Sequence, residues 1–285
     1  MTGAGIVLFN PSIQRLKENL DAITVQVDFT VLIDNGSNNL IDIKKLLSCY
    51  SNIELIENNK NLGIAKALNQ IVEVARNKGV KWVLTLDQDT VCRESLIAQY
   101  QQFVCLDNVA SLTCEIEDRN FSYSIYDSSN ANYTIIDKCI TSGNYINIDA
   151  WAKIGGYDES FFIDSVDTDF CYRLLQAGYK IVRIPFPGIL HEVGYNTKRR
   201  KLFGKEIVVF NHSPFRCYYL VRNQIYFGRK HQKSLGWRKA LRYRRTAWTR
   251  IIVYLLFEEN KMKKMKAWIK GLIDGYRMQV KNVDD

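Results

Sequence analysis

Short apolar runs alternate with amphipathic segments through the first ninety residues, and this alternation limits the folds open to the chain. The predicted strands are 5–9, 29–33, 53–57 and 80–86, and the predicted helices between them are 12–23, 40–50 and 64–78. Ser12 is the expected N-cap of the first helix. This βαβαβαβ order predicts a parallel sheet with right-handed crossovers, and 285 residues with 47% apolar content can bury a full α/β core.

The pattern changes after residue 90, where predicted strands follow one another without helices between them. A helix is expected over 93–106, strands over 109–116, 121–126 and 133–140, a helix over 168–177, and a strand over 179–184 that ends at Pro185 and Pro187. Consecutive strands indicate a small antiparallel or mixed extension of the sheet. From about Lys198 onward the sequence is basic, aromatic and predicted to be helical.

Two carboxylates, Asp87 and Asp89, come directly after the apolar run that forms the fourth predicted strand. Open α/β sheets bind ligands at the carboxyl ends of their strands, and two acids placed there are costly to leave unpaired. A divalent cation is the usual compensation, and oxygen ligands favour Mg²⁺ or Mn²⁺. The alternative is an acidic turn that only caps the following helix.

Polar residues also follow the first and second predicted strands. Together with the residues after the fourth strand they form the expected ligand-binding rim, which contains Asn10, Asp34, Asn35, Gly36, Asp87, Gln88 and Asp89. A nucleotide is the expected ligand, and Asp34 is suited to accept hydrogen bonds from a pyrimidine ring or a ribose. The alternative for the Asp34–Ser37 segment is an ordinary turn, since Asn-Gly favours one.

A second acidic cluster lies at 161–169, before a predicted helix. Asp167 and Asp169 fall at the helix N-terminus, where capping and the helix dipole favour acids on structural grounds alone. The functional interpretation is a general base that takes the proton of an acceptor hydroxyl. Arg173 is expected to pair with one of these acids. His191 is the expected third ligand of the cation because imidazole suits Mn²⁺, and a purely structural histidine is the alternative.

These elements together resemble the inverting glycosyltransferases of family 2, in particular the bacterial rhamnosyltransferases. The resemblance covers about residues 4–225 and is carried by FNPS, LIDNGSNN, NKNLGIAKALN, LTLDQDT, TSGNYI, FFIDSVDTDFCYRL and ILHEVG in this order. It implies an α/β GT-A nucleotide-diphospho-sugar transferase fold, a Rossmann-like mixed sheet flanked by helices. The implied domains are a catalytic domain over 1–225 and a basic helical membrane-association region over 226–285.

The resemblance also implies a role for each matched residue. Asn10 and Asp34 would contact the nucleotide, with Asp34 on the base, and its pocket would be lined by Asn35, Gly36, Asn61, Gly63, Lys66, Asp87 and Gln88. Asp89 and His191 would hold Mn²⁺ or Mg²⁺ on the diphosphate, and the sugar ring would lie at Gly143 and Asn144. Asp167 would be the catalytic base with Asp169 supporting it. Asp164 lies in the same cluster, so the choice among the three acids stays open.

The implied reaction moves a sugar to an acceptor hydroxyl in one displacement that inverts the anomeric carbon. The resemblance favours dTDP-L-rhamnose as donor, with UDP-hexoses next, and surface polysaccharide or O-antigen as product. A rival enzyme class is the haloacid-dehalogenase-type phosphatases, in which Asp87 would attack phosphorus, but the spacing of Asp87, Asp89 and Thr90 departs from their first motif. A non-enzymatic rival is a sugar-nucleotide-binding scaffold protein.

Charge is distributed unevenly along the chain. Residues 1–197 have 16 basic and 24 acidic residues, whereas residues 198–281 have 23 basic and 4 acidic residues. Amphipathic basic segments with tryptophans suit an anionic bilayer, so the expected partner is the cytoplasmic face of the plasma membrane, where a polyprenyl-diphosphate-linked oligosaccharide would be the acceptor. Nucleic-acid binding, which we do not expect, and plain helix packing are the alternatives. Seven cysteines without metal-type spacing, and an N-terminus without a signal-peptide pattern, fit this cytoplasmic location.

Overall fold

The predicted alternation of strands and helices is present in the computed structural model, which describes residues 1–118, 121–124, 131–191, 198–202 and 205–280. The chain divides by packing into two units. The first contains Met1–Phe162 and Val166–Val193, and the second contains Ile163–Ser165 and Gly194–Asp285. The boundary expected after residue 225 would fall inside helix α7 (Pro214–Lys230), whose Val221 and Ile225 are buried in the core of the second unit.

A mixed sheet forms the centre of the first unit, with the strand order β3-β2-β1-β4-β9-β6-β10-β5. Its strands along this order are β3 (Ile53–Glu57), β2 (Phe29–Asp34), β1 (Gly3–Leu8), β4 (Trp82–Asp87), β9 (Asn144–Asn147), β6 (Val109–Asp118), β10 (Lys180–His191) and β5 (Val91–Cys92). β7 (Phe121–Ser124) pairs with β6, and β8 (Thr134–Ile136) pairs with β10. β1 to β4 are parallel as predicted, while β9 is antiparallel to both of its neighbours.

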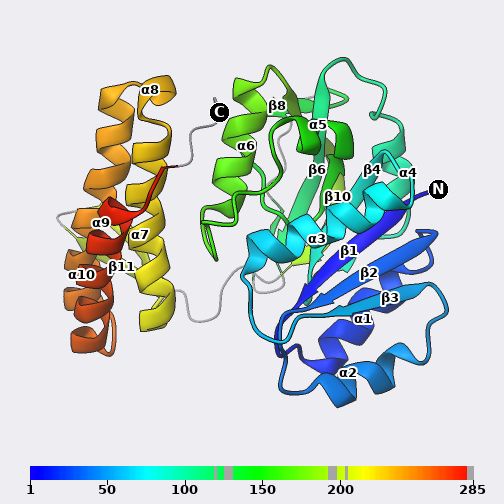
Figure 1. Cartoon of the computed structure of the whole chain (residues 1–285), viewed down its shortest axis with the longest axis horizontal. Helices are drawn as coiled ribbons and strands as arrows, with labels where there is room; N and C mark the ends of the chain where they lie inside the picture. Colours follow the sequence, from blue (N-terminus) through cyan, green and yellow to red (C-terminus); the bar gives the residue numbers. More distant parts are fainter. Residues whose placement is uncertain (119–120, 125–130, 192–197, 203–204, 281–285) are drawn as a thin grey trace. The chain divides into compact units, whose positions relative to one another are not determined.

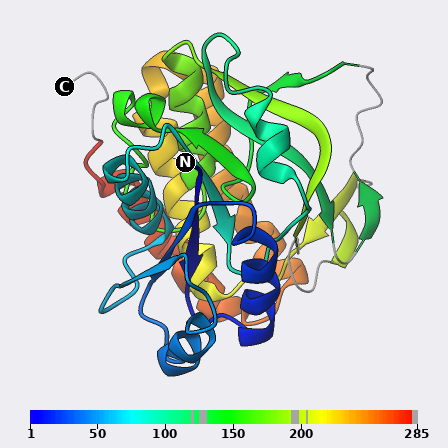
Figure 2. The same cartoon turned by 90° about the vertical axis from the view of Figure 1, so that its right-hand side faces the viewer.

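Helices cover both faces of this sheet. They are α1 (Ile13–Ile23), α2 (Leu40–Leu47), α3 (Ile64–Asn77), α4 (Leu96–Gln101), α5 (Ile148–Lys153) and α6 (Val166–Gln176). Helices α1 and α3 lie on opposite faces of the sheet (Figures 1 and 2). Ile6 of β1 shares a buried cluster with Leu16 of α1, whereas Gly5 faces α3. A Cβ at Gly5 would lie 2.1 Å from Ile71 Cγ2, so the close approach of α3 requires glycine there.

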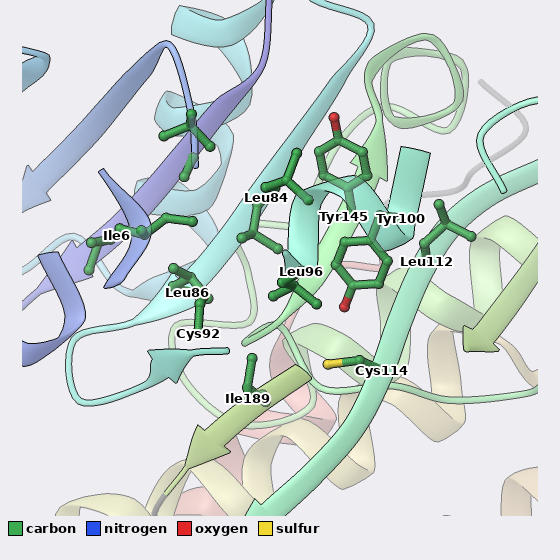
Figure 3. Packing of buried hydrophobic residues seen from close by; sticks show 14 of the residues in the cluster. Ile6, Leu84, Leu86, Cys92, Leu96, Tyr100, Leu112, Cys114, Tyr145 and Ile189 are labelled. Carbon is green, nitrogen blue, oxygen red and sulfur yellow. The ribbon is translucent and has the colours of Figure 1, made fainter. Parts of the chain in front are cut away.

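Aromatic packing holds the antiparallel strand β9 in the middle of the sheet. Tyr145 of β9 stacks on Tyr100 of α4 with ring centroids 5.6 Å apart, and the two rings lie among Leu84, Leu96 and Leu112 (Figure 3). The Tyr100 hydroxyl donates to the Gly143 carbonyl at 2.5 Å. This buried cluster therefore positions the residues that lead into β9.

Four of the predicted elements differ from the observed ones. The strand expected over 133–140 is only Thr134–Ile136. The helix expected over 93–106 is shorter, Leu96–Gln101. The strand expected to end before Pro185 continues to His191, because the pairing with β6 shifts register on both sides of Pro187 and accommodates a residue without an N–H. Residues 198–202 and 205–209, predicted to be helical, form the two antiparallel strands of a hairpin, β11 (Lys198–Leu202) and β12 (Lys205–Val209).

The strand predicted over 121–126 is confirmed for 121–124, and its last two residues lie outside the described part of the chain. The second unit continues from the hairpin into α7, α8 (Gln232–Leu235), α9 (Trp237–Phe257) and α10 (Lys261–Arg277). The basic helical extension predicted for the C-terminal region is therefore confirmed from residue 214 onward. Among the helices of the described residues, none has both the length and the apolar character needed to cross a bilayer.

Candidate active site

The carboxyl ends of β1, β2 and β4 lie in register at one edge of the sheet, as the sequence predicts. Leu8 of β1 pairs with Asp34 on one side, and Val7 pairs with Asp87 on the other. The loops that follow are joined by side chains. The backbone N–H of Phe9 donates to Gln88 Oε1 at 2.8 Å, and the N–H of Asn10 donates to Ser37 Oγ at 2.8 Å. The predicted rim is thus one connected structure.

Asp34 is the buried carboxylate of this rim. Its Oδ2 accepts hydrogen bonds from the backbone N–H groups of Gly36 and Ser37, at 3.1 and 3.0 Å. Its Oδ1 is buried and has no hydrogen-bond partner among the described residues. Buried carboxylate oxygens are costly to leave without a donor, so this atom indicates a place where a ligand N–H or O–H would bind.

Asn35 joins the loop after β2 to the loop after β3. Its Nδ2 donates to Asn61 Oδ1 at 3.1 Å and to the Gly63 carbonyl at 3.2 Å, while its Oδ1 accepts from Asn58 Nδ2 and the Leu62 N–H, both at 3.1 Å. Gly36 has a φ of +83°, and a Cβ there would lie 2.9 Å from Lys60 Cα. A glycine is therefore required where these two loops pass.

The diacid and His191 meet although about a hundred positions separate them. His191 Nε2 lies 3.9 Å from Asp87 Oδ2, and Nδ1 lies 3.9 Å from Asp89 Oδ1. Both separations exceed a hydrogen bond. All three side chains are partly exposed, so the cluster opens to solvent. Within the described residues, no group of three or more His, Cys, Asp and Glu side chains is arranged to hold an ion on its own.

Two hydroxyl side chains fix the orientation of His191, and the sequence patterns did not identify them for this role. Thr90 Oγ1 is 2.8 Å from His191 Nδ1 and 2.7 Å from Ser142 Oγ, and Thr90 is fully buried. Ser142 Oγ also accepts the N–H of Asp87 at 3.0 Å. Because Thr90 engages Nδ1, Nε2 is the ring nitrogen that remains for a ligand. The sequence signal that could have identified these two residues is their position, since Thr90 directly follows the diacid and Ser142 directly precedes Gly143.

Asp167 lines a cavity of about 250 Å³ in the first unit. The other lining residues are Thr113, Cys114, Glu115, Ile116, Ile136, Lys138, Cys139, Ile140, Thr168 and Arg183. Strand pairing connects this cavity to the cluster of the diacid and His191. Ile116 lines the cavity and pairs with Ile189 of β10, which lies two residues before His191. Ile140 likewise lies two residues before Ser142. Glu115, Lys138 and Arg183 are charged groups of this cavity that the sequence patterns did not single out.

The three acids of the 161–169 cluster have different surroundings. Asp169 is fully buried and accepts from Arg173 Nε at 2.7 Å, which confirms the predicted ion pair. Asp164, which belongs to the second unit, pairs with Arg216 Nη2 at 2.9 Å. Asp167 accepts the N–H of Thr168 at 2.7 Å, and it is the one of these three acids that lines the cavity.

The remaining predicted residues make structural contacts. Lys66 Nζ pairs with Glu159 Oε1 at 3.1 Å. The Gly143 N–H donates to the Thr85 carbonyl at 2.9 Å, and buried Asn144 accepts from Ser111 Oγ at 2.6 Å. Gly143 follows Ser142, and so the loop 141–143 lies beside the diacid strand.

Cys139 lines the cavity as a protonated thiol. Its Sγ is 3.7 Å from Cys171 Sγ. The hydrogen bond with Cys171, together with burial, raises the pKa of Cys139 well above its ordinary value. A thiol with a raised pKa is a poor nucleophile. The cavity therefore presents a carboxylate for proton transfer and no activated thiolate at Cys139.

A polar rim at the carboxyl ends of parallel strands, a diacid facing a histidine and an acid-lined cavity are features typical of the active sites of α/β enzymes. The family model that matches the chain is "Glycosyl transferase family 2", over residues 5–163, more than half of the chain. The chain belongs to this family. It is a glycosyltransferase with the predicted GT-A fold, and the phosphatase alternative is not supported.

Relatives and solved structures agree with this assignment. The chain is 28% identical to dTDP-rhamnosyl transferase RfbF of Shigella flexneri, over 96% of this chain and 95% of the relative. It is 21% identical to rhamnosyltransferase WbbL of Escherichia coli K12, over 75% and 89%. The fold is similar to mannosyltransferase PcManGT from Pyrobaculum calidifontis, solved with GDP-Man and Mn²⁺, with a TM-score of 0.60 and 13% identity over 96% and 86% of the chains. It is also similar to GalNAc-T7, solved with UDP, GalNAc and Mn²⁺, with a TM-score of 0.55 and 15% identity over 78% and 47%.

Proposed function

We propose that this glycosyltransferase transfers L-rhamnose from dTDP-L-rhamnose, with inversion and with a divalent metal ion, to a lipid-linked oligosaccharide in surface polysaccharide or O-antigen synthesis. The similarity to two named rhamnosyltransferases supports the donor sugar. The observation that carries the chemistry is the position of His191, 3.9 Å from both Asp87 and Asp89. The acceptor is proposed to be a polyprenyl-diphosphate-linked oligosaccharide at the cytoplasmic face of the plasma membrane.

The residues of the diacid cluster fit Mn²⁺ or Mg²⁺. Carboxylate oxygens and an imidazole are suitable ligands, and such ions are commonly held by one or two protein groups together with substrate phosphates. Asp89 and His191 are the proposed ligands, and Asp87 lies within reach of His191 Nε2. When bound, the metal would offset the charge that develops on the departing nucleoside diphosphate.

The base of the donor is proposed to bind at Asp34. Thymine and uracil rings both carry an N–H donor, and Asp34 Oδ1 is a buried acceptor without a partner among the described residues. Asn10, Asn35, Gly36, Asn61, Gly63, Lys66 and Gln88 are proposed to line the nucleotide pocket, and Gly143 and Asn144 the sugar. To contact the donor, Lys66 would have to leave its ion pair with Glu159 and bind phosphate oxygens instead.

Asp167 is the proposed general base. It lines the same cavity as Ile116, whose strand partner Ile189 lies two residues before His191, and as Ile140, which lies two residues before Ser142. Asp167 takes the proton from the acceptor hydroxyl while that oxygen attacks the anomeric carbon opposite the leaving group. Asp169 supports the site indirectly, because its pairing with Arg173 fixes the start of α6.

The test is transfer by the purified full chain from dTDP-L-rhamnose to a synthetic polyprenyl-diphosphate-linked sugar with Mn²⁺. We expect Asp167→Asn to lower transfer by about 10² to 10⁴ while dTDP binding, measured by calorimetry, stays at the parent value. Asp149→Asn is the matched control, since Asp149 is an exposed acid in the first turn of α5. Parent-like turnover by Asp167→Asn would refute the assignment of Asp167 as the general base. Use of UDP-hexoses instead of dTDP-L-rhamnose would refute the proposed donor sugar.

A further inference from the structure

Helices α9 and α10 each have an apolar stripe that the core of the second unit does not use. That core contains Val221 and Ile225 of α7, Ala247 and Tyr254 of α9 and Leu272 of α10. Figure 1 shows these three helices side by side. The exposed stripe of α9 consists of Leu241, Trp248, Ile252 and Leu255, and that of α10 consists of Met262, Ile269, Ile273 and Tyr276. Within each set, successive residues are seven, four and three positions apart, and this spacing places the set on one side of its helix.

The two stripes meet. Trp248 Nε1 donates to the Tyr276 hydroxyl at 3.4 Å, and the Trp248 ring packs edge-on against Trp268 with centroids 5.4 Å apart. The exposed apolar side chains of the two helices therefore lie next to each other around these rings. Contiguous exposed apolar surface of this kind marks an interaction site.

A basic pocket lies beside the stripes. Its volume is about 340 Å³, and its described lining residues are Arg229, Lys230, Gln232, Lys233, Arg244, Tyr276 and Val280. Four of these seven are cations and none is acidic. Tyr276 belongs both to the pocket and to the stripe of α10, so the basic and apolar surfaces adjoin.

The two arginines of the pocket donate hydrogen bonds to neutral acceptors, and these contacts do not neutralise their positive charges. Arg229 Nη1 donates to the carbonyls of Gly275 and Met278, at 2.9 and 2.8 Å. Arg244 Nη2 donates to Gln232 Oε1 at 3.0 Å, and Arg244 Nε is buried without a hydrogen-bond partner among the described residues. Phosphate oxygens are strong acceptors for guanidinium groups.

We infer that the pocket binds the phosphate of an anionic membrane lipid while the two stripes lie in the interfacial region of the bilayer. Charge complementarity identifies the occupant, since α9 contains six Lys or Arg residues and no acid, and α10 contains six and one acid. Amphipathic basic helices with exposed aromatic residues bind anionic bilayer surfaces in this way. The inference deepens the proposed function by naming the surface that would bring the enzyme to a lipid-linked acceptor.

Sedimentation of the full chain with lipid vesicles tests the inference without any activity measurement. The vesicles contain phosphatidylcholine alone or phosphatidylcholine with phosphatidylglycerol. We expect binding that requires phosphatidylglycerol and that falls about 25-fold in Lys230→Gln/Lys233→Gln, roughly fivefold for each charge removed. Lys45→Gln/Lys81→Gln removes the same charge from exposed positions of the first unit and should bind like the parent. Arg244→Lys, which keeps the charge but loses the planar fork, should also weaken binding.

Ile252→Ser/Leu255→Ser tests the stripe and should weaken binding while leaving the pocket intact. Equal losses of vesicle binding in Lys230→Gln/Lys233→Gln and in the control would overturn the role of the pocket in lipid binding. A parent protein that does not sediment with anionic vesicles would overturn the whole inference. Calorimetry with inorganic phosphate and binding to single-stranded RNA separate other sources of phosphate. Binding of either without vesicle binding contradicts a lipid ligand. Vesicle binding by a protein that lacks rhamnosyl transfer would leave this inference standing and refute only the proposed function.

Discussion

Asp34→Asn is the most informative single substitution, because one orientation of the new amide is wrong for the turn after β2 and the other is wrong for a nucleotide base. The carboxylate now accepts two backbone N–H groups on Oδ2 and leaves Oδ1 buried without a described partner. With its NH₂ group at the Oδ2 position, the asparagine would face the N–H groups of Gly36 and Ser37. With NH₂ at the Oδ1 position, it would face the N–H of a bound thymine.

The expected loss follows from one hydrogen bond to a charged, desolvated acceptor. Such a bond contributes about 1.5–3 kcal/mol, and 1.4 kcal/mol corresponds to about tenfold in affinity. Binding of dTDP should therefore weaken by roughly 10- to 150-fold. The free energy of unfolding should stay unchanged or rise, because the ligand-free protein loses a buried charged oxygen that had no donor.

Isothermal titration of dTDP with Mn²⁺ measures the affinity, and urea unfolding measures the stability. Asp42→Asn is the control, since Asp42 is exposed on α2 and should show parent values in both experiments. The reasoning fails if Asp34→Asn binds dTDP like the parent. It also fails if stability and affinity fall together, because Asp34 would then only support the turn at Gly36.

Three further outcomes are expected. Asp169→Ala should lower the free energy of unfolding by about 3–5 kcal/mol in urea titrations, because it leaves Arg173 buried without its partner. Thr90→Val should weaken Mn²⁺ binding by about 10- to 100-fold in calorimetry, with activity restored at saturating Mn²⁺, since the hydroxyl orients His191. Burial lowers the pKa of His212 below its ordinary 6.5, so the unfolded chain takes up the proton first and stability should fall as the pH drops below about 6.5, less so in His212→Gln.

Each of these outcomes has a direct contradiction. A stability change for Asp169→Ala as small as that of Asp149→Ala, an exposed acid, would show that the ion pair does not hold the helix. Unchanged Mn²⁺ affinity in Thr90→Val would separate His191 from metal binding. Identical acid dependence of unfolding in His212→Gln and the parent would assign that dependence to other groups.

The sequence patterns predict well the elements whose partners are close in the chain. β1 to β4 and α1 to α3 follow from local periodicity, and observed bounds such as Ile53–Glu57 agree with the predicted ones. β9 has no such signal, because its partners β4 and β6 are distant in sequence and only their pairing makes Asn144–Asn147 extended. The strands β11 and β12 do not follow from the sequence patterns, because a run of basic residues fits a helix as well as a strand.

The site divides in the same way. The positions of the diacid and the rim follow from strand ends and residue chemistry, and the assignment of Asp89 and His191 as metal ligands stays a prediction, with the two side chains 3.9 Å apart. Thr90 and Ser142 could not be identified, since their hydrogen bonds join positions 52 and 101 residues apart and depend on side-chain geometry. The separate surroundings of Asp164, Asp167 and Asp169 likewise arise from residues outside their own motif.

The loops joined by Asn35 come entirely from the chain before residue 64, whereas the diacid, Asp167 and His191 come after residue 86. The residues proposed to recognise the base and those proposed to act on the sugar are therefore encoded in separate stretches of the gene. A crossover near residue 64 would exchange the proposed base site and keep the diacid, Asp167 and His191. Related enzymes of different donor preference could arise by such recombination, and chimaeras joined at this position offer a direct route to altered nucleotide choice.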